Sequence, residues 1–490
     1  MMGSEPEVLA PKMETHQLLK KPQNNLSSIL KRYFNFEDTE IVQIWKDVFI
    51  LGIAYFTFRL CYLSYIFNLG VLFAPDLAFI TLATSFGAET LTSLFLPTLV
   101  IRTLGCKIVI VLISATTLLF GLAEFMPSYY TFIPCGMLLG AGYSCLWVAL
   151  ATYLTNISQI YVKLREATVE AILGLFFGIV CFLGALGGVL GNIITYVILE
   201  ATEETIDNVY FGVNRTVVCG AQYCEHPLPV AVNASVLTDK MFTHNEQKSR
   251  TTLFLIYIGL GLIGPLAVSL FLNRRQKLEE AMRKTEIGAF QQIVATVMAL
   301  KNINLALLSV SCFLNGITFS FASGNFSQAY VDCAVGSEFV AIVAVVHLIA
   351  YSLASVGSGI LLKYISIMKI FLFVNITAEV VYVLMLVWKP DTDGLLIASA
   401  FSGWLGAFVA IYTNLLNTIC GIILHGNREA TFAFFRLFYS LGSTVGFAAT
   451  NHTCAWIMIT VFMVLIVIGT VLYLIAEYRI RIEKKAAASS

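Results

Sequence analysis

Two side chains of opposite charge, Arg59 and Glu89, lie within long apolar stretches of this sequence. A charged group in hydrocarbon is costly, so such residues face a protein interior and are either paired or functional. If the two stretches are neighbouring helices that run in opposite directions, Arg59 and Glu89 fall at a similar depth and are able to pair. Two interpretations stay open: a buried ion pair that joins two helices, or a substrate or gating site at the middle of a membrane.

The elements that hold these residues are apolar runs, each long enough to cross a bilayer of ~30 Å as a helix of ~20 residues. Six such runs precede a basic segment that extends from Asn273 to Asn302, and six follow it. The composition agrees, since 58% of the 490 residues are hydrophobic, 12% are charged and the mean hydropathy is +0.82. The sequence therefore predicts an all-α polytopic membrane protein with twelve transmembrane helices in two six-helix pseudo-repeats, the outline of a major facilitator-type fold.

The distribution of Lys and Arg predicts the orientation. Basic residues, Arg436 among them, collect on the side that also holds both termini, and the positive-inside rule makes that side cytosolic. The expected order is a cytosolic tail (1–46), an amino-terminal bundle (47–273) with an external loop (200–250), a cytosolic linker (274–302), a carboxy-terminal bundle (303–477) and a cytosolic tail (478–490). The tail over 1–46 contains no apolar core of a cleavable signal peptide, so we expect the first span to start insertion.

The external loop carries signals of an extracellular or luminal location. Acceptor sequences for N-glycosylation begin at Asn214 and Asn233, and a third, at Asn451, falls on the same side of the membrane. We expect sugars at these three positions.

The same loop holds Cys219 and Cys224, which lie close enough in sequence to form a disulfide with each other in an oxidising compartment. Free thiols, or bonds to a distant partner such as Cys333 or Cys454, are the alternatives. A metal site is not expected, because no second cysteine or histidine pair has suitable spacing.

The first tail contains a candidate sorting signal. Glu14 stands four positions ahead of the pair Leu18 and Leu19, which is the pattern that endosomal sorting adaptors read on cytosolic tails. A plain disordered tail is the alternative. The sorting pattern keeps an endosomal or lysosomal membrane open as the location of the protein.

Other classes of function lack their motifs. No phosphate-binding P-loop, zinc-binding His-Glu helix, nucleophile elbow or kinase motif occurs, so we expect neither an enzyme nor a cofactor. The formal net charge is zero, which gives no general attraction for nucleic acid. The sequence also lacks the arginine ladder of a voltage sensor and the signature of a carbonyl selectivity filter.

Two further ionisable side chains fall within the second set of spans. Glu379 is central in the ninth span, which packs on the outside of the bundle in this fold. We therefore favour a protonated or hydrogen-bonded helix contact over a transport carboxylate. His347 lies in the outer half of the eighth span. It titrates near physiological pH and is able to sense protons, although a lone intramembrane histidine is more often a hydrogen-bonding packing residue.

Several short motifs recur in a specific order and spacing. They include Leu104-Gly105-Cys106-Lys107, Tyr130-Thr131-Phe132-Ile133-Pro134, Thr152-Tyr153-Leu154-Thr155, the loop from Cys219 to Cys224, and Tyr330-Val331-Asp332-Cys333. Together they resemble the Unc-93-like (uncoordinated) family, in particular its animal branch called homologue A. The resemblance covers most of the chain after residue 46.

The resemblance implies a location in the cell membrane and a role beside other membrane proteins. One member resembles a regulatory subunit of a two-pore-domain potassium channel in muscle, and another branch escorts Toll-like receptors to endolysosomes. This chain departs from the family pattern at Val148, Leu150 and Tyr412-Thr413, where polar cavity groups are lost or shortened, while Asn417 remains. A site for a polar solute needs hydrogen-bonding groups, so these losses favour partner binding over transport.

Two hypotheses about function remain. We prefer a non-enzymatic membrane protein that modulates or escorts another membrane protein, an ion channel or receptor, with a potassium channel as the leading example. The alternative is a secondary transporter that uses Arg59 and Glu89, with Glu379 as a further candidate, to bind a small solute or to couple a proton or cation.

Overall fold

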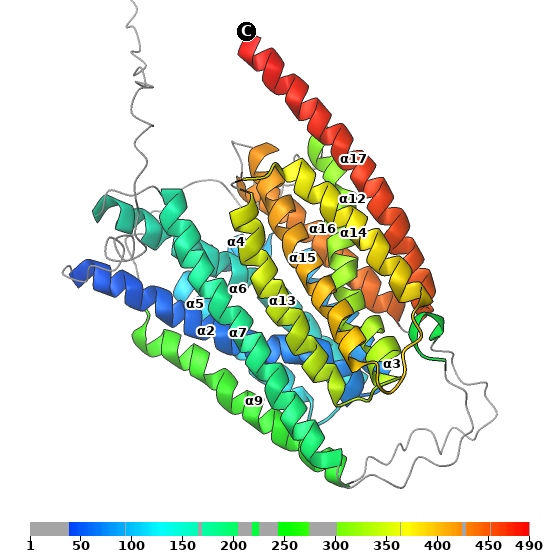
Figure 1. The fold of residues 1–490 in the computed structure, drawn as a ribbon. Helices are drawn as coiled ribbons and strands as arrows, with labels where there is room; N and C mark the ends of the chain where they lie inside the picture. Colours follow the sequence, from blue (N-terminus) through cyan, green and yellow to red (C-terminus); the bar gives the residue numbers. More distant parts are fainter. Residues whose placement is uncertain are drawn as a thin grey trace, which may run out of the picture. The chain divides into compact units, whose positions relative to one another are not determined.

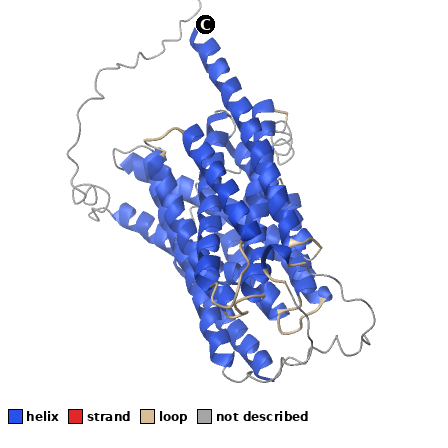
Figure 2. Ribbon diagram, turned by 45° about the vertical axis from the view of Figure 1, so that its right-hand side comes forward, coloured by secondary structure: helices blue, strands red, loops and turns tan. Residues whose placement is uncertain are grey.

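The computed structural model describes residues 39–93, 95–164, 169–203, 218–224, 244–273, 301–362, 364–423, 428–450 and 452–489. Every regular element in these residues is a helix, and no strand occurs among them (Figure 1, Figure 2). The amino-terminal half contains α2 (Thr39–Leu72), α3 (Pro75–Thr92), α4 (Leu96–Leu104), α5 (Cys106–Ala123), α6 (Tyr129–Leu164), α7 (Val169–Glu203), the short η1 (Gly220–Gln222) and α9 (His244–Phe271). The carboxy-terminal half contains α12 (Ile303–Ser323), η2 (Ser327–Asp332), α13 (Phe339–Leu361), α14 (Ile367–Val387), α15 (Leu395–Ile423), α16 (Arg428–Thr450) and α17 (Ala455–Ser489).

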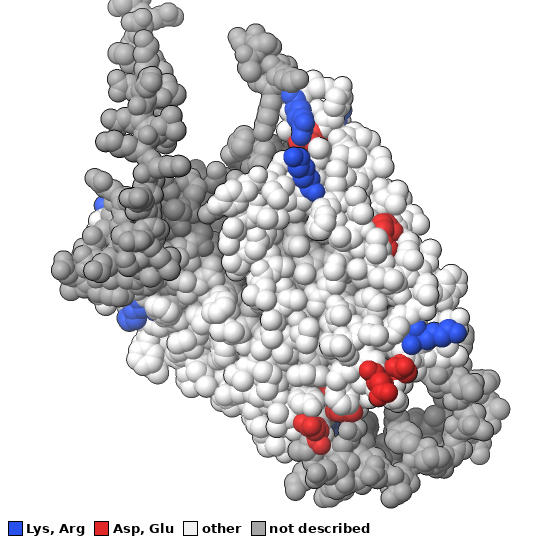
Figure 3. Space-filling model, viewed as in Figure 1, with Lys and Arg blue, Asp and Glu red and all other residues white. Residues whose placement is uncertain are grey.

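Ten of the described helices are long and apolar enough to cross a membrane. The prediction of an all-helical, multi-pass membrane protein is therefore confirmed. Two other long helices, α3 and α16, carry charged residues together with many small polar ones, and they fall short of the same measure of hydropathy. Figure 3 shows charged side chains near the two ends of the visible face, with a broad and nearly uncharged zone between them. Such a zone suits contact with lipid.

One turn of the amino-terminal half is set by glycine and a basic residue. Gly105 separates α4 from α5 with a φ of +83°, a conformation that L side chains rarely adopt. The ammonium group of Lys107 then donates hydrogen bonds to the carbonyl oxygens of Ser269 (3.0 Å) and Leu272 (2.7 Å) at the end of α9. A lysine at this position satisfies carbonyl groups that a helix leaves unpaired at its carboxyl end, so the turn fastens α5 to α9.

Glycines allow α7 to approach α2 closely. A Cβ atom at Gly187 would overlap the carbonyl oxygen of Phe56, and one at Gly191 would overlap the carbonyl oxygen of Leu60. The two glycines are four residues apart on one face of α7, which is the small-residue spacing typical of tightly packed membrane helices. The absence of a side chain at both positions therefore permits backbone contact between α2 and α7.

Two of the helix pairs that join the two halves are α3 with α16 and α7 with α13. Phe447 of α16 stacks on Phe86 and Phe79 of α3, with ring centroids 5.3 and 6.4 Å apart. Tyr196 of α7 lies 6.3 Å from Phe339 of α13 between ring centroids. We call the end at which α7 ends and α13 begins the disulfide end, because both disulfides described below lie there. The opposite end, where α9 ends and α12 begins, is the linker end.

Candidate functional site

An ion pair joins the two halves of the protein. Glu89 of α3 is fully buried, and its carboxylate contacts the guanidinium of Arg436 on α16, whose side chain is 23% exposed. From the sequence, a pair between Glu89 and Arg59 was one of two open interpretations, and Arg436 was assigned to the cytosolic side. The structure corrects both expectations. Because α3 and α16 pack directly on each other, Arg436 lies inside the bundle and takes the place expected for Arg59.

Aromatic rings complete the surroundings of Arg436. Its guanidinium carbon lies 4.8 Å from the ring centroid of Tyr143 and 5.3 Å from that of Tyr439. Tyr143 in turn stacks on Tyr62 of α2, at 4.9 Å between centroids. The faces of aromatic rings attract cations, and this attraction strengthens when water is excluded. Arg436 is therefore held by one carboxylate and two rings that come from three different helices.

Arg59 lies in the same region without a carboxylate partner among the described residues. Its guanidinium carbon is 5.7 Å from the ring centroid of Tyr55, and its Nε atom is buried with no hydrogen-bond partner. Phenol groups from both halves, including those of Tyr143 and Tyr351, are within electrostatic reach of it. Tyr62 is within reach of Arg59, Arg436 and Glu89 alike. We call these three charged residues and their tyrosines the central arginine site; it carries two positive charges and one negative charge.

An aromatic layer separates the central arginine site from the disulfide end. The ring of His347 on α13 lies 5.2 Å from that of Phe67 on α2, and Phe67 lies 6.3 Å from Phe319 on α12. His347 is buried, and its Nδ1 atom is 3.1 Å from the carbonyl oxygen of Ser402 on α15. His347 thus has the hydrogen bond and the close packing of a residue that holds helices together.

The other sequence candidates lie away from these charges. Asn417 of α15 uses its amide to donate a 2.8 Å hydrogen bond to the carbonyl oxygen of Thr413 in its own helix. Glu379 belongs to α14, which packs chiefly on α15 and α17 and not on the helices of the central site. The structure therefore brings Arg59 and Glu89 into one region and leaves Glu379 and Asn417 outside it.

Sequence reasoning missed a polar network between α14, α15 and α17. Asn375 donates a 2.7 Å hydrogen bond to the hydroxyl of Thr470, and it accepts a 2.9 Å hydrogen bond from the hydroxyl of Tyr412. One residue further along α15, the hydroxyl of Thr413 accepts a 2.8 Å hydrogen bond from Asn315 of α12. Tyr412 and Thr413 are two of the positions at which the chain departs from the family pattern. Here they connect helices of the carboxy-terminal half.

A buried carboxyl, Glu124, was also missed. It follows α5 directly, and neither of its oxygens has a hydrogen-bond partner among the described residues. Tyr65 and Cys61 of α2 are within electrostatic reach of it. In the sequence, the only sign of this buried carboxyl is the position of Glu124 at the end of an apolar stretch. Glu124 is not part of the central arginine site.

The two cysteines of the external loop form disulfides with other partners than expected. Cys219 bonds Cys333, which follows η2, and Cys224 bonds Cys454, which precedes α17. The expected bond between Cys219 and Cys224 is wrong, because the turn between them lies on the carboxy-terminal half, where each thiol meets a cysteine of that half. The carbonyl oxygen of Tyr223 accepts a 3.0 Å hydrogen bond from the backbone of Ala455, which fastens the same turn.

Several predicted positions lie outside the described residues. These are the glycosylation acceptors Asn214, Asn233 and Asn451 and the sorting pattern of Glu14, Leu18 and Leu19. They stay predictions.

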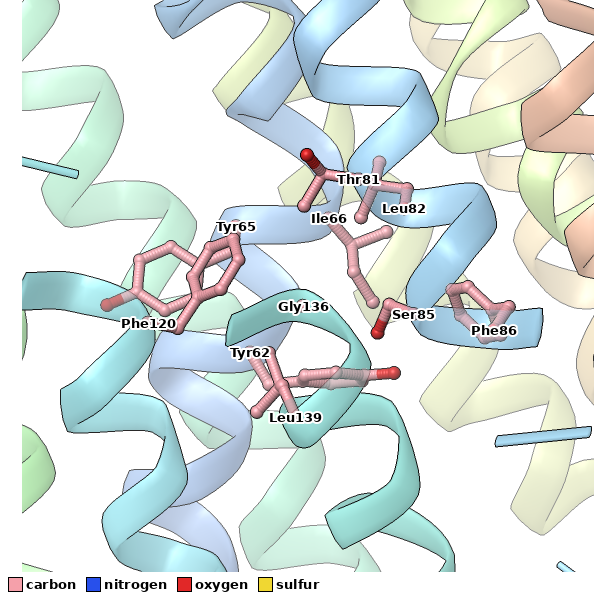
Figure 4. Close-up of a pocket in the computed structure, with 10 residues that line it drawn as sticks. All are labelled: Tyr62, Tyr65, Ile66, Thr81, Leu82, Ser85, Phe86, Phe120, Gly136 and Leu139. Atoms are coloured by element: carbon pink, nitrogen blue, oxygen red, sulfur yellow. The ribbon is translucent and has the colours of Figure 1, made fainter. Parts of the chain in front are cut away.

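A small cavity lies between α2, α3, α5 and α6 of the amino-terminal half (Figure 4). Its volume of about 10 Å³ is close to the minimum that holds one water molecule. The residues that line it are mostly apolar or aromatic: Tyr62, Tyr65, Ile66, Thr81, Leu82, Ser85, Phe86, Phe120, Gly136 and Leu139. It is too small for an organic solute.

Solved structures with the same arrangement of helices define the class of protein. The chain superposes on the nucleoside transporter NupG with a TM-score of 0.58 and 12% identity, covering 88% of this chain and 98% of that one. It superposes on a variant of the Escherichia coli fucose:proton symporter FucP with a TM-score of 0.53 and 12% identity, covering 90% and 99%. The protein is therefore a multi-pass membrane protein with the fold of the major facilitator superfamily.

Within that fold the sequence identifies the family. The model of the family described as "Ion channel regulatory protein UNC-93" matches residues 75–474, and the chain belongs to this family. It is 27% identical to "Protein unc-93 homolog A" of Xenopus laevis over 415 residues, or 84% of this chain and 88% of that protein. It is 25% identical to the "Putative potassium channel regulatory protein unc-93" of Caenorhabditis elegans over 435 residues, or 86% and 60%. The resemblance to the Unc-93-like family is confirmed.

Proposed function

We propose that this protein regulates a potassium channel by binding it within the membrane. The match to a family of ion channel regulatory proteins, which extends from the start of α3 into α17, is the observation that carries the proposal. A relative in Caenorhabditis elegans is named as a putative regulator of a potassium channel, which supports that class of partner. We infer that the protein acts by binding its partner and not by catalysing a reaction, which agrees with the lack of the enzyme motifs named above.

Two features of the interior support binding over transport. In rocking transporters the two halves move against each other around a central site. Here the Glu89–Arg436 pair and the stacked rings of Phe86 and Phe447 join the halves directly at that site. Such contacts favour one packed arrangement of the two halves, which suits a protein that presents a fixed surface to a partner.

Co-expression with potassium channels tests the proposal. The full chain is produced in oocytes with members of the two-pore-domain class, and the current and the surface amounts of both proteins are measured. We expect a change in current at equal surface amount, together with recovery of channel and chain in one crosslinked complex. Unchanged currents, with both proteins at the surface and eluting separately, would contradict the proposal.

We also propose that α3 and α16 cross the membrane with the ten more apolar helices, so that both termini and the linker face the cytosol. The positive-inside rule supports this orientation. The domain boundaries at 46, 273, 302 and 477 follow from it.

An acceptor for N-glycosylation inserted between Arg275 and Lys284 should stay unmodified, whereas removal of Asn214 and Asn233 should increase electrophoretic mobility. Attachment of sugar to the inserted acceptor would show that the linker faces the outside and not the cytosol. Surface biotinylation then decides between the cell membrane and an endolysosomal membrane.

Arg59 supports a second candidate function, the binding or transport of a small anion. Because Glu89 is occupied by Arg436, Arg59 supplies a positive charge without a described counter-charge, and aromatic rings surround it. Benzoate, benzyl alcohol and benzylamine are matched probes that differ in charge. If the site binds an anion, benzoate alone should raise the melting temperature of the purified protein, and Arg59→Gln should remove that effect. An equal response to all three probes would exclude a site for anions.

A further inference from the structure

The helix α14 presents an apolar face that no other described part of the protein covers. Its exposed side chains are spaced by three and four residues, and their exposed fractions run from 46% for Val383 to 73% for Val387. The line consists of Phe373, Ile376, Val380, Val383 and Val387. This spacing places the side chains along one side of the helix, in the pattern through which two helices pack together. We call this line the α14 ridge.

One ionisable side chain interrupts the apolar surface beside the α14 ridge. Glu379 lies next to Val380 near the middle of α14 and is half-buried, so it stands at the edge of the exposed face. One of its carboxyl oxygens is buried without a hydrogen-bond partner, and no described residue forms an ion pair with it. On the face shown in Figure 3, an acidic patch interrupts the uncharged zone over α14 and α17. The sequence predicts a protonated or hydrogen-bonded helix contact for Glu379, and among the described residues no hydrogen bond to its buried oxygen occurs.

The neighbouring helix α17 shows that contact with lipid does not explain this carboxyl. α17 has a similar exposed line of Val461, Val464, Ile468, Val471 and Ile475. No acidic or basic residue occurs between the first and the last of these positions. An apolar line alone is what a lipid-facing helix needs, whereas a carboxyl group at that depth is costly. Among the described residues, therefore, Glu379 has no partner for its carboxyl group.

We propose that the α14 ridge docks a transmembrane helix of the partner protein, and that this helix carries a lysine or arginine opposite Glu379. A carboxylate and a basic group on separate helices are each costly in lipid, and their contact replaces both exposures with a charge-assisted hydrogen bond. The ridge supplies the packing surface. The carboxylate of Glu379 determines how deep in the membrane the partner helix lies and which of its residues meet the ridge. Charged residues beside the apolar interface of a coiled coil have the same role.

This inference rests on the proposed function, because it needs a membrane-protein partner, and it names the chemistry by which that partner is recognised. Neutral helices gain little from associating in lipid, since lipid tails are as apolar as their side chains. A buried basic residue is therefore the feature that distinguishes the correct partner helix from others.

A synthetic transmembrane helix tests the contact directly. The probe is a labelled peptide of leucine and alanine with one central lysine, and its control has leucine at that position. Association with the full chain, fused to a fluorescent protein after Ser490, is measured by energy transfer in lipid vesicles. We expect the lysine peptide to bind about ten-fold more tightly than the control peptide. Glu379→Gln should remove this difference, and Glu379→Asp should keep part of it. Equal binding of the two peptides to the native chain, or an undiminished difference with Glu379→Gln, overturns the proposal.

A matched pair of variants locates the surface. Ile376→Ala with Val380→Ala trims the α14 ridge, and Val464→Ala with Ile468→Ala trims the line on α17 by a similar amount. We expect the first pair to weaken binding of the lysine peptide several-fold, and the second to leave it unchanged. Equal losses would show that the peptide does not use α14. Melting temperatures of both variants confirm that each is folded.

Channel currents separate this inference from the proposed function. If the native chain changes a channel current and Glu379→Gln changes it equally, α14 is not the docking face although the regulatory function stands. If the native chain changes no current but binds the lysine peptide through Glu379, the docking face stands and the regulatory function falls.

Discussion

The carboxylate of Glu89 on α3 contacts the guanidinium of Arg436 on α16, and this pair joins the two halves of the protein in its interior. We predict that Glu89→Gln lowers the free energy of unfolding by ~3–5 kcal/mol, because Arg436 then stays buried without its counter-charge. Reversible unfolding in mixed micelles measures the change.

A double variant checks that the loss comes from the pair. Arg436→Gln alone should cost a similar amount, since it strands Glu89. Glu89→Gln combined with Arg436→Gln should recover much of the loss, because neither charge remains. A double variant whose loss equals the sum of the two single losses would show that the residues act independently.

Removal of the Arg59 charge should raise the free energy of unfolding, whereas removal of the Glu89 or Arg436 charge should lower it. Because no described carboxylate balances its charge, Arg59→Gln should stabilise the ligand-free protein by ~1–3 kcal/mol, a value bounded by the ~3 kcal/mol insertion cost of a central arginine. The same unfolding assay applies, and Arg59→Lys, which keeps the charge, should give no such gain. A loss as large as that of Arg436→Gln would reveal a counter-charge outside the described residues.

The disulfide pattern predicts a covalent connection between the halves. Cleavage at a protease site inserted between residues 275 and 284 should leave two fragments that migrate together without reductant and separate with it. Cys219→Ser alone should not separate them, because the bond from Cys224 to Cys454 remains. Cys219→Ser with Cys224→Ser should separate them without reductant. Separation of the native fragments before reduction would instead favour a local bond between Cys219 and Cys224.

Close packing of α2 on α7 predicts a strong effect of one methyl group. Gly187→Ala should destabilise the protein by ~1–3 kcal/mol, because its Cβ would overlap the carbonyl oxygen of Phe56, which is backbone and cannot rotate away. Gly178 of the same helix is the matched control, since a Cβ there has no atom within 4 Å. Gly178→Ala should leave the melting temperature unchanged or slightly higher. Equal effects of the two substitutions would contradict the close approach of α2 and α7.

The fold was predictable from sequence because its signals are local. The length of each apolar run and the basic segment at the middle of the chain each follow from a few consecutive residues, and they suffice for an all-helical membrane protein in two halves. Even the glycine spacing of α7 is local, and the close contact that it predicts with a neighbouring helix is present.

The partners of the site residues were not predictable in the same way. Arg59 and Glu89 lie in consecutive apolar stretches of the sequence. Glu89 nevertheless pairs with Arg436 in the other half of the chain, because α3 packs on α16. Arg436 lies only two turns from the start of α16, so a rule based on helix ends assigned it to the surface. Cys219 and Cys224 were misassigned to each other for the same reason, since short separation in sequence was the only distance available.

The loop cysteines find their partners only late in the chain. Cys333 lies 114 positions after Cys219, and Cys454 lies 230 positions after Cys224. During synthesis, therefore, the thiol of Cys224 stays reactive until the ribosome has added nearly all of the second bundle. A chain that stops before Cys454 keeps this thiol open to thiol–disulfide exchange. Closure of the second bond thus requires that the carboxy-terminal bundle has been synthesised as far as the start of its last helix.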